Sequence, residues 1–126
     1  MRYAATLGTL IVLLVAAPHA EDRTAAELYS ATLSLERNLR TPNEQAPTLN
    51  DLRVAISSYE TIQRQFPTSA YGDNALWQAA GLALVAFDHY HQQLDFNTGK
   101  RLLNRLLVDY PKSSLVSRGA ERRKRF

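Results

Sequence analysis

Apolar residues recur at steps of three and four positions along much of the chain, which is the period of an amphipathic helix. The stretch 69–92 carries two such stripes instead of one. The first stripe consists of Leu76, Ala80, Ala83, Phe87 and Tyr90, and the second of Ala75, Ala79, Leu82, Val85 and Ala86. A helix with apolar residues on two sides has to be covered on two sides. The pattern therefore predicts a helix over 69–92 at the centre of the fold.

Weaker amphipathic patterns lie before and after this central segment. Residues 21–40 begin with acids and end with bases, which suits the dipole of a helix. Residues 51–66 and 98–110 carry regular apolar stripes, and 113–126 starts a further segment. The polar residues opposite the stripe of 51–66 are expected to face solvent: Arg53, Glu60 and Arg64. No stretch shows the alternation of a strand, so the sequence predicts an all-α fold.

Breaks between the helices are marked by proline and by short polar segments. We expect a loop at 41–50 and a turn at 93–97, while Pro67 and Pro111 end the helices before them. The residues expected to cap the following helices with their side chains are Asn50, then Thr68 or Ser69, and finally Ser113 or Ser114.

Short pieces of sequence recur in a way that indicates an internal repeat. Residues 66–69 (FPTS) return as 110–113 (YPKS), and 28–31 (LYSA) return as 76–79 (LWQA). Each copy then forms a helix pair, 21–66 and 69–110, and a third copy begins at 113–126. A single pair cannot bury both of its faces, so the copies are expected to stack as about two and a half repeats of antiparallel helix hairpins.

The terminal Phe66-Pro67 and Tyr110-Pro111, the stretch 75–81, and Tyr59 with Ile62 resemble tetratricopeptide repeats. The spacing here is longer than the roughly 34 residues of that family. Residues 59–87 and 102–116 are also similar to the helical region that precedes the catalytic domain of certain secreted bacterial N-acetylmuramoyl-L-alanine amidases. That second resemblance implies that catalysis belongs to a downstream zinc domain, outside this chain.

The aromatic and aliphatic residues at the repeated positions are expected to form the core. They are Tyr59, Ile62, Phe66, Leu76, Trp77, Ala83, Phe87, Tyr90, Leu103, Leu106 and Tyr110. Trp77, together with Tyr71 and Tyr90, could instead line a binding groove, but packing within the stack is the favoured interpretation.

The first twenty residues have the pattern of a secretory signal peptide. A basic start at Arg2 precedes an uncharged core at 4–17, and small Ala20 is placed for cleavage. The core is short for a membrane span, although an uncleaved anchor is the alternative. The chain contains no cysteine and therefore no disulfide and no lipid-modified cysteine. The sequence thus predicts an exported, periplasmic protein with a helical repeat domain at 21–126, which touches the membrane only through its signal peptide.

The formal net charge of +3 comes from the C-terminus, where Arg118, Arg122, Arg123, Lys124 and Arg125 stand against Glu121. The remainder of the mature chain is close to neutral. A basic tail can indicate nucleic-acid binding, but export argues against that partner. We interpret the tail as a solvated helix end, or as the place where the chain was cut.

No residues with the spacing of a catalytic or metal site are evident. His89 and His91 point about 200° apart on a helix and cannot ligate one metal together, even with Asp88 and Asp95 nearby. No nucleophile elbow or glycine-rich phosphate loop is present. We therefore expect no catalytic residue, no metal ligand and no cofactor in this chain. Two hypotheses follow: an exported interaction module that binds an envelope protein or a peptidoglycan-associated partner, or the non-catalytic part of a zinc-dependent amidase.

Overall fold

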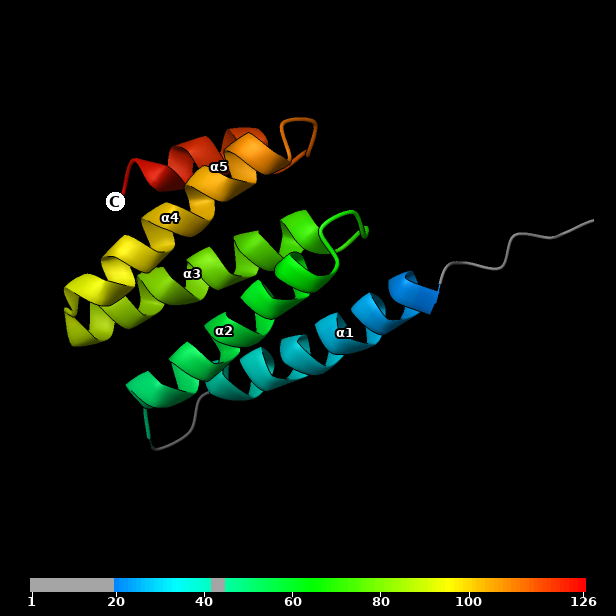
Figure 1. Ribbon diagram of the computed structural model, residues 1–126. Helices are drawn as coiled ribbons and strands as arrows, with labels where there is room; N and C mark the ends of the chain where they lie inside the picture. The colour runs from blue at the N-terminus through cyan, green and yellow to red at the C-terminus, as the bar shows by residue number, and fades with distance from the viewer. Residues whose placement is uncertain (1–19, 42–44) are drawn as a thin grey trace, which may run out of the picture.

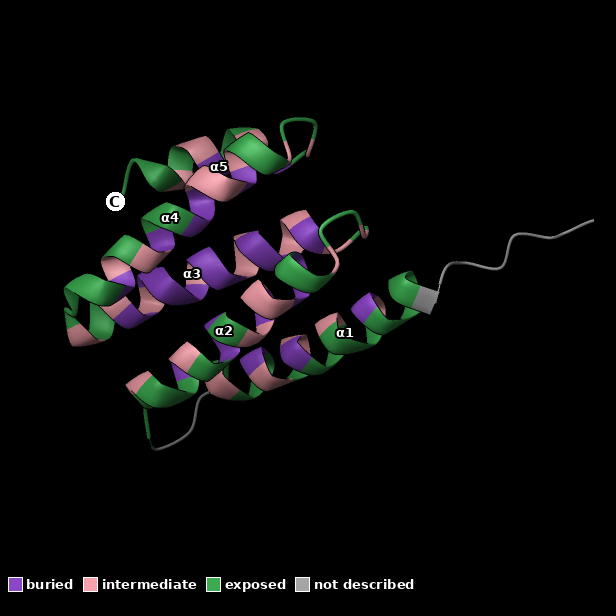
Figure 2. Ribbon diagram, in the orientation of Figure 1, coloured by how far each residue is buried: buried purple, intermediate pink, exposed green. Residues whose placement is uncertain are grey.

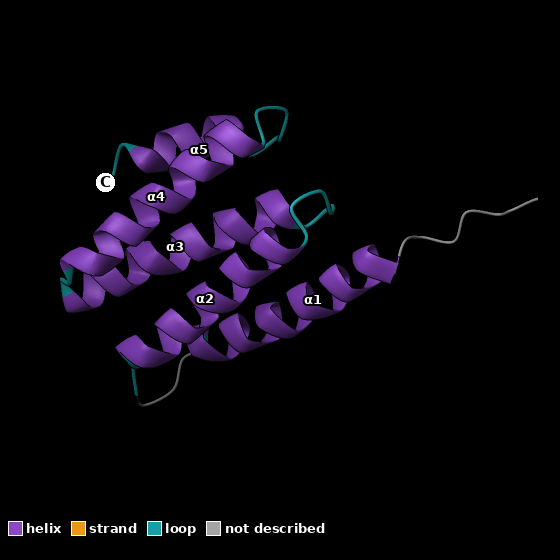
Figure 3. Cartoon of the chain, in the orientation of Figure 1, coloured by secondary structure: helices purple, strands orange, loops and turns teal. Residues whose placement is uncertain are grey.

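The computed structural model of the protein describes residues 20–41 and 45–126. Within these ranges the secondary structure consists of helices joined by short loops, without strands (Figure 3). The helices are α1 (Ala20–Arg40), α2 (Leu49–Gln65), α3 (Gly72–Tyr90), α4 (Gln93–Asp109) and α5 (Val116–Arg123). The all-α fold predicted from the sequence is confirmed.

The helices stack in the order in which they follow along the chain. Each helix packs against the next one, so that α1 and α5 lie at opposite ends of the stack and α3 lies between α2 and α4 (Figure 1). The most extensive contacts are those of α3 with its two neighbours. The stacked hairpins predicted from the repeat are thus present in the described part of the chain.

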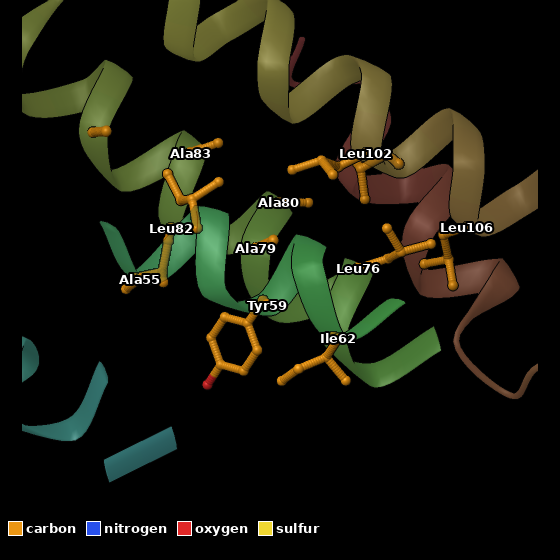
Figure 4. Close-up of a cluster of buried hydrophobic side chains, with 14 of the residues drawn as sticks. Ala55, Tyr59, Ile62, Leu76, Ala79, Ala80, Leu82, Ala83, Leu102 and Leu106 are labelled. Atoms are coloured by element: carbon orange, nitrogen blue, oxygen red, sulfur yellow. The ribbon is translucent and has the colours of Figure 1, made fainter. Parts of the chain in front are cut away.

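The core follows from the small residues of α3. Ala75, Ala79, Ala80, Ala83 and Ala86 are fully buried, and their methyl groups allow α2 and α4 to approach closely. Larger side chains from both neighbours fill the space beside them, as Figure 4 shows: Tyr59 and Ile62 from α2, and Leu102 and Leu106 from α4. Burial accordingly runs through the middle of the stack, whereas α1 is exposed along much of its length (Figure 2).

A buried polar contact joins α1 to α2. The Tyr59 hydroxyl donates to Oε2 of Glu36 at 2.6 Å, and Nε of Arg40 donates to Oε1 of the same carboxylate at 2.8 Å. Glu36 is only 4% exposed. Its charge is tolerated because both of its oxygens are hydrogen-bonded.

The two proline turns have the same local geometry. The residue before each proline ends its helix with nearly equal torsions, φ −129° and ψ 59° at Phe66 and φ −126° and ψ 55° at Tyr110. In each turn the hydroxyl of the serine two residues after the proline accepts a hydrogen bond from a backbone N–H. Ser69 accepts from Tyr71, and Ser113 accepts from Leu115. The recurrence of sequence at 66–69 and 110–113 therefore corresponds to a recurrence of structure.

Several expected helix ends are corrected by the structure. The cap of α2 is Thr48 and not Asn50, because Oγ1 of Thr48 accepts from the Asp51 N–H at 3.1 Å. The residue at the N-cap of α3 is Tyr71, which makes no side-chain cap, so neither Thr68 nor Ser69 has that role.

The start of α4 is also earlier than predicted, at Gln93 instead of residue 98. His91 takes a left-handed conformation with φ 53° and ends α3 in a single residue, so the expected turn at 93–97 is already helical. The buried Asp95 then lies in the first turn of α4, where its charge suits the helix dipole.

The cap expected for the last segment is wrong as well, since α5 begins after Leu115 without a side-chain cap. Ser113 instead accepts from the Leu115 N–H and donates its hydroxyl to Oδ2 of Asp73 at 2.6 Å. That bond links the second proline turn to the first turn of α3.

The expected secretory signal at 1–20 lies outside the described residues except for Ala20. Among the helices that the structure describes, none combines the length and the apolar character needed to cross a membrane.

Candidate functional site

Arginines occur in two different settings in this fold, and the first is between α2 and α4. Arg53 of α2 donates from Nε and Nη2 to both carboxylate oxygens of Asp95, at 3.0 and 2.9 Å. In the opposite direction, Arg101 of α4 donates to both oxygens of Glu60 on α2. The pKa of Glu60 is lowered, chiefly by that hydrogen bond. Arg53 and Glu60 were expected to face solvent. The Arg53 side chain is still 38% exposed, whereas that of Glu60 is only 17% exposed. Both reach across to α4 because each finds an oppositely charged partner there.

The second setting is a tryptophan on α3 that is covered by arginines of α5. The Cζ atom of Arg122 lies 3.3 Å from the centroid of the Trp77 ring, and that of Arg118 lies 4.8 Å away. Trp77 is half-buried. A guanidinium over an indole face is attracted by the ring's negative π-surface. We call Trp77, Arg118 and Arg122 the arginine–tryptophan site.

The helix spacing explains how these groups meet. Arg118 and Arg122 are four residues apart and therefore neighbours on one side of α5. Trp77 and Gly81 have the same relation on α3. A Cβ atom on Gly81 would lie 3.1 Å from Nη1 of Arg122, so the glycine provides room for the guanidinium beside the helix.

Arg122 is fixed by a hydrogen bond as well as by stacking. Its Nη1 donates to the main-chain oxygen of Trp77 at 2.9 Å. Among the described residues, no carboxylate forms an ion pair with Arg122 or with Arg118. This lack of a counter-charge distinguishes them from the arginines between α2 and α4.

The electrostatic environment of Arg122 is unfavourable for its charge. The pKa of its guanidinium is lowered to about 10, mainly by burial and then by the positive charges of Arg118, Arg40 and Arg125, in that order. The negative charge of Glu36 raises this pKa, and its effect is the smallest of those named here. The group is still protonated at neutral pH, so the site carries a positive charge that the fold only partly compensates.

The surface around the site is hollowed. A shallow depression of about 410 Å³ is lined by Trp77, Ser117, Arg118, Glu121 and Arg122. Since guanidinium groups are planar forks of N–H donors, they match the two oxygens of a carboxylate or phosphate. The depression can therefore hold an anionic group beside an aromatic ring.

A second depression of similar size lies between α1 and α3. Its walls include Leu39 and Arg40 from the end of α1 and Leu82, Val85 and His89 from α3. Trp77, Gly81, Val85 and His89 follow each other at four-residue steps along α3. One stripe of α3 thus runs from the arginine–tryptophan site to this second depression.

The structure divides the expected core residues into two groups. Buried are Tyr59, Ile62, Leu76, Ala83, Leu103 and Leu106, whereas Phe66, Trp77, Phe87, Tyr90 and Tyr110 are only partly buried. Two of the partly buried residues use their hydroxyl groups, which donate to main-chain oxygens: Tyr90 to Pro47 and Tyr110 to Pro67.

The residues weighed for metal binding or a groove are not brought together. His89 is exposed on α3 and lines the second depression, while His91 contacts the Phe87 ring edge-on. Tyr71 packs against Tyr29 of α1, with ring centroids 5.1 Å apart. Within the described residues, no three His, Cys, Asp or Glu side chains are grouped as metal ligands would be.

The role of the basic C-terminus was missed by the sequence interpretation. Arg122 is stacked on Trp77, Arg123 donates to Asn104, and Arg125 pairs with Asp88 at 3.6 Å, so the segment is more than a solvated helix end. The four-residue spacing of Arg118 and Arg122 indicates only that both lie on one side of a helix, and not that this side meets Trp77.

Comparison of the chain with protein-family models, with curated proteins and with solved structures finds no match. The resemblance to tetratricopeptide repeats and to the helical region of amidases therefore stays a prediction, and the site has to be interpreted from its own geometry.

Proposed function

We propose that the chain is an exported helical-repeat module that binds another protein of the bacterial cell envelope on the face formed by α3 and α5. The observation that carries this proposal is the half-buried guanidinium of Arg122 over Trp77, which has no carboxylate partner in the described part of the chain. Export is supported by the sequence pattern of residues 1–20.

The kinds of side chain gathered at the site favour binding over catalysis. An arginine stays protonated at neutral pH even with a pKa near 10, so Arg122 is poorly suited to transferring protons. Tryptophan and arginine, in contrast, are the residue types that most often contribute strongly to protein interfaces. A half-buried indole with two guanidinium groups over it provides both contact area and directed hydrogen-bond donors.

Crosslinking in cells of the source organism tests this proposal. A photoreactive amino acid at Ser117, which lines the depression, should crosslink the chain to one discrete envelope protein. The same amino acid at Val108, which is 75% exposed on α4, is the matched control and should not give that product. An absence of any protein adduct at Ser117, or an identical pattern at both positions, would contradict the proposal. A cell fractionation with the same protein checks the expected export.

A further inference from the structure

The charges around the arginine–tryptophan site can be assigned pair by pair. Arg40 is paired with Glu36 on α1, Arg125 with Asp88, and Lys124 with Glu121. When these pairs are set aside, and with Arg123 turned toward Asn104 of α4, the charges of Arg118 and Arg122 remain among the described residues. The face therefore has a small, localised positive excess instead of a broad basic surface.

Stacking restricts how these two charges can be solvated. The ring of Trp77 covers one side of the Arg122 guanidinium, and one of its N–H groups is already donated to the main-chain oxygen of Trp77. Arg118 is held near the same ring and repels Arg122. An anion between the two guanidinium groups would relieve that repulsion and accept the N–H groups that remain.

The surface next to the arginine–tryptophan site favours a ligand that also carries an apolar group. The second depression, with Leu39, Leu82 and Val85 in its walls, lies further along the same stripe of α3. From Trp77 to Val85 the helix rises about 12 Å, at roughly 1.5 Å per residue. An extended chain covers that distance with about four residues, at roughly 3.3 Å each.

We infer that the face binds an acidic peptide segment of the partner protein, with a carboxylate between Arg118 and Arg122 and an apolar side chain about four positions away in the depression at Val85. This inference rests on the proposed function. It specifies the partner's chemistry: one or two carboxylates suit an excess of two positive charges, whereas a polyanion such as a nucleic acid is bound by a longer run of positive charges.

The protein contains its own reporter, since Trp77 is the only tryptophan. The probe is a seven-residue peptide of glycine and serine that carries one glutamate and, four positions later, one leucine. Adding it to the purified full chain should change the Trp77 fluorescence and saturate at concentrations below about 1 mM, as for a weak, specific site. Replacing the glutamate by glutamine should weaken binding about tenfold, because the charge-assisted hydrogen bonds are lost.

Substitutions in the chain distinguish binding at the arginine–tryptophan site from a general effect of the protein's net charge. R118Q/R122Q should weaken binding of the glutamate peptide about tenfold or more. The control R23Q/K112Q removes the same charge from exposed positions outside the site and should change binding less than about twofold. If the double variant does not fold by circular dichroism, R118Q alone replaces it, because Arg118 is an exposed side chain.

Each alternative ligand is an outcome that would overturn the inference. Inorganic phosphate or a single-stranded oligonucleotide that changes the Trp77 signal as strongly as the peptide would assign the site to phosphate groups. Equal affinity for the glutamate and glutamine peptides would show that the site does not recognise a carboxylate. The crosslink at Ser117 distinguishes the two proposals: if it forms in R118Q/R122Q as in the wild type, this inference fails while the proposed function stands, and if it never forms, the proposed function fails.

Discussion

The contacts between α2 and α4 and the contacts between α3 and α5 use the same side chain in opposite ways. Arg53 finds both oxygens of the buried Asp95, and Arg101 finds both oxygens of Glu60. Arg122 finds an indole ring and a main-chain oxygen. Where the chain supplies the opposite charge, the arginine joins two helices; where it does not, the arginine remains able to bind an anion from elsewhere.

The pair of Arg53 with Asp95, in which Asp95 is buried and Arg53 is partly exposed, should show the largest effect on stability. R53M leaves Asp95, which is 2% exposed, as a buried charge without its main partner. We expect the free energy of unfolding to fall by about 3 kcal/mol in denaturant titrations. R64M is the matched control on the same helix, because Arg64 is exposed and donates to Thr61, without an ion pair among the described residues. It should cost about 0.5 kcal/mol or less.

Adding D95N to R53M should restore part of the loss, since the uncompensated charge is then gone. Equal losses in R53M and R64M would mean that the Arg53–Asp95 contact contributes no more than a surface residue, and the contrast between the two regions would disappear.

The buried hydrogen bond from Tyr59 to Glu36 provides a second comparison, which depends on pH. Burial and the hydrogen bond to Glu36 raise the pKa of Tyr59 far above its ordinary value of 10.0. Below pH 10 both folded and unfolded chains keep this proton, so the stabilising effect is fully present. Above pH 10 the unfolded chain loses the proton first, and stability falls as the pH rises.

The slope should approach about 1.4 kcal/mol per pH unit for this one group. Tyr29 and Tyr110 also have raised pKa values, so the measurement is the difference in slope between wild type and Y59F from pH 9 to 11. Parallel curves for the two proteins would show that Tyr59 does not hold its proton in the folded state.

At the arginine–tryptophan site the corresponding substitution, R122M, should change the free energy of unfolding much less than R53M does. R122M removes the stacking charge and one hydrogen bond, but it also removes a desolvated charge whose pKa is lowered to about 10. We expect the free energy of unfolding at pH 7 to change by about 1 kcal/mol or less, in contrast to R53M.

The sign of the pH dependence is also opposite to that of Tyr59. Because the folded-state pKa of Arg122 is below its unfolded value, its penalty is present below pH 10 and is relieved as the pH rises above 10. Wild type should therefore gain stability relative to R122M between pH 10 and 11. A loss relative to R122M in that interval would show that the guanidinium is stabilised by its surroundings.

The sequence predicted the helices better than the side-chain contacts of either region. Helical period placed α2, α3 and most of α4, because each buries a regular apolar stripe. The start of α4 at Gln93 was missed since it depends on the left-handed His91, which no pattern required. The stacking of Arg122 on Trp77 was missed because it joins residues 45 positions apart through the crossing of two helices. A pattern along one helix carries no information about such a crossing.

The smallest effect on stability is expected at Gly81, where the two helices of the site meet. In G81A the new Cβ would lie 3.1 Å from Nη1 of Arg122, which is the far end of a flexible side chain and can move aside. Alanine within a helix is favoured over glycine by about 1 kcal/mol, which offsets the weakened stacking. We expect stability to change by about 0.5 kcal/mol or less, while the Trp77 fluorescence changes because the guanidinium has shifted. G72A is the matched control: its Cβ would overlap the Tyr110 hydroxyl and lie 3.2 Å from the main-chain oxygen of Pro67, so stability should fall clearly. If G81A destabilises the protein as much as G72A does, the guanidinium is locked in place, and the site belongs to the structural contacts of the first region instead of to a surface that binds a partner.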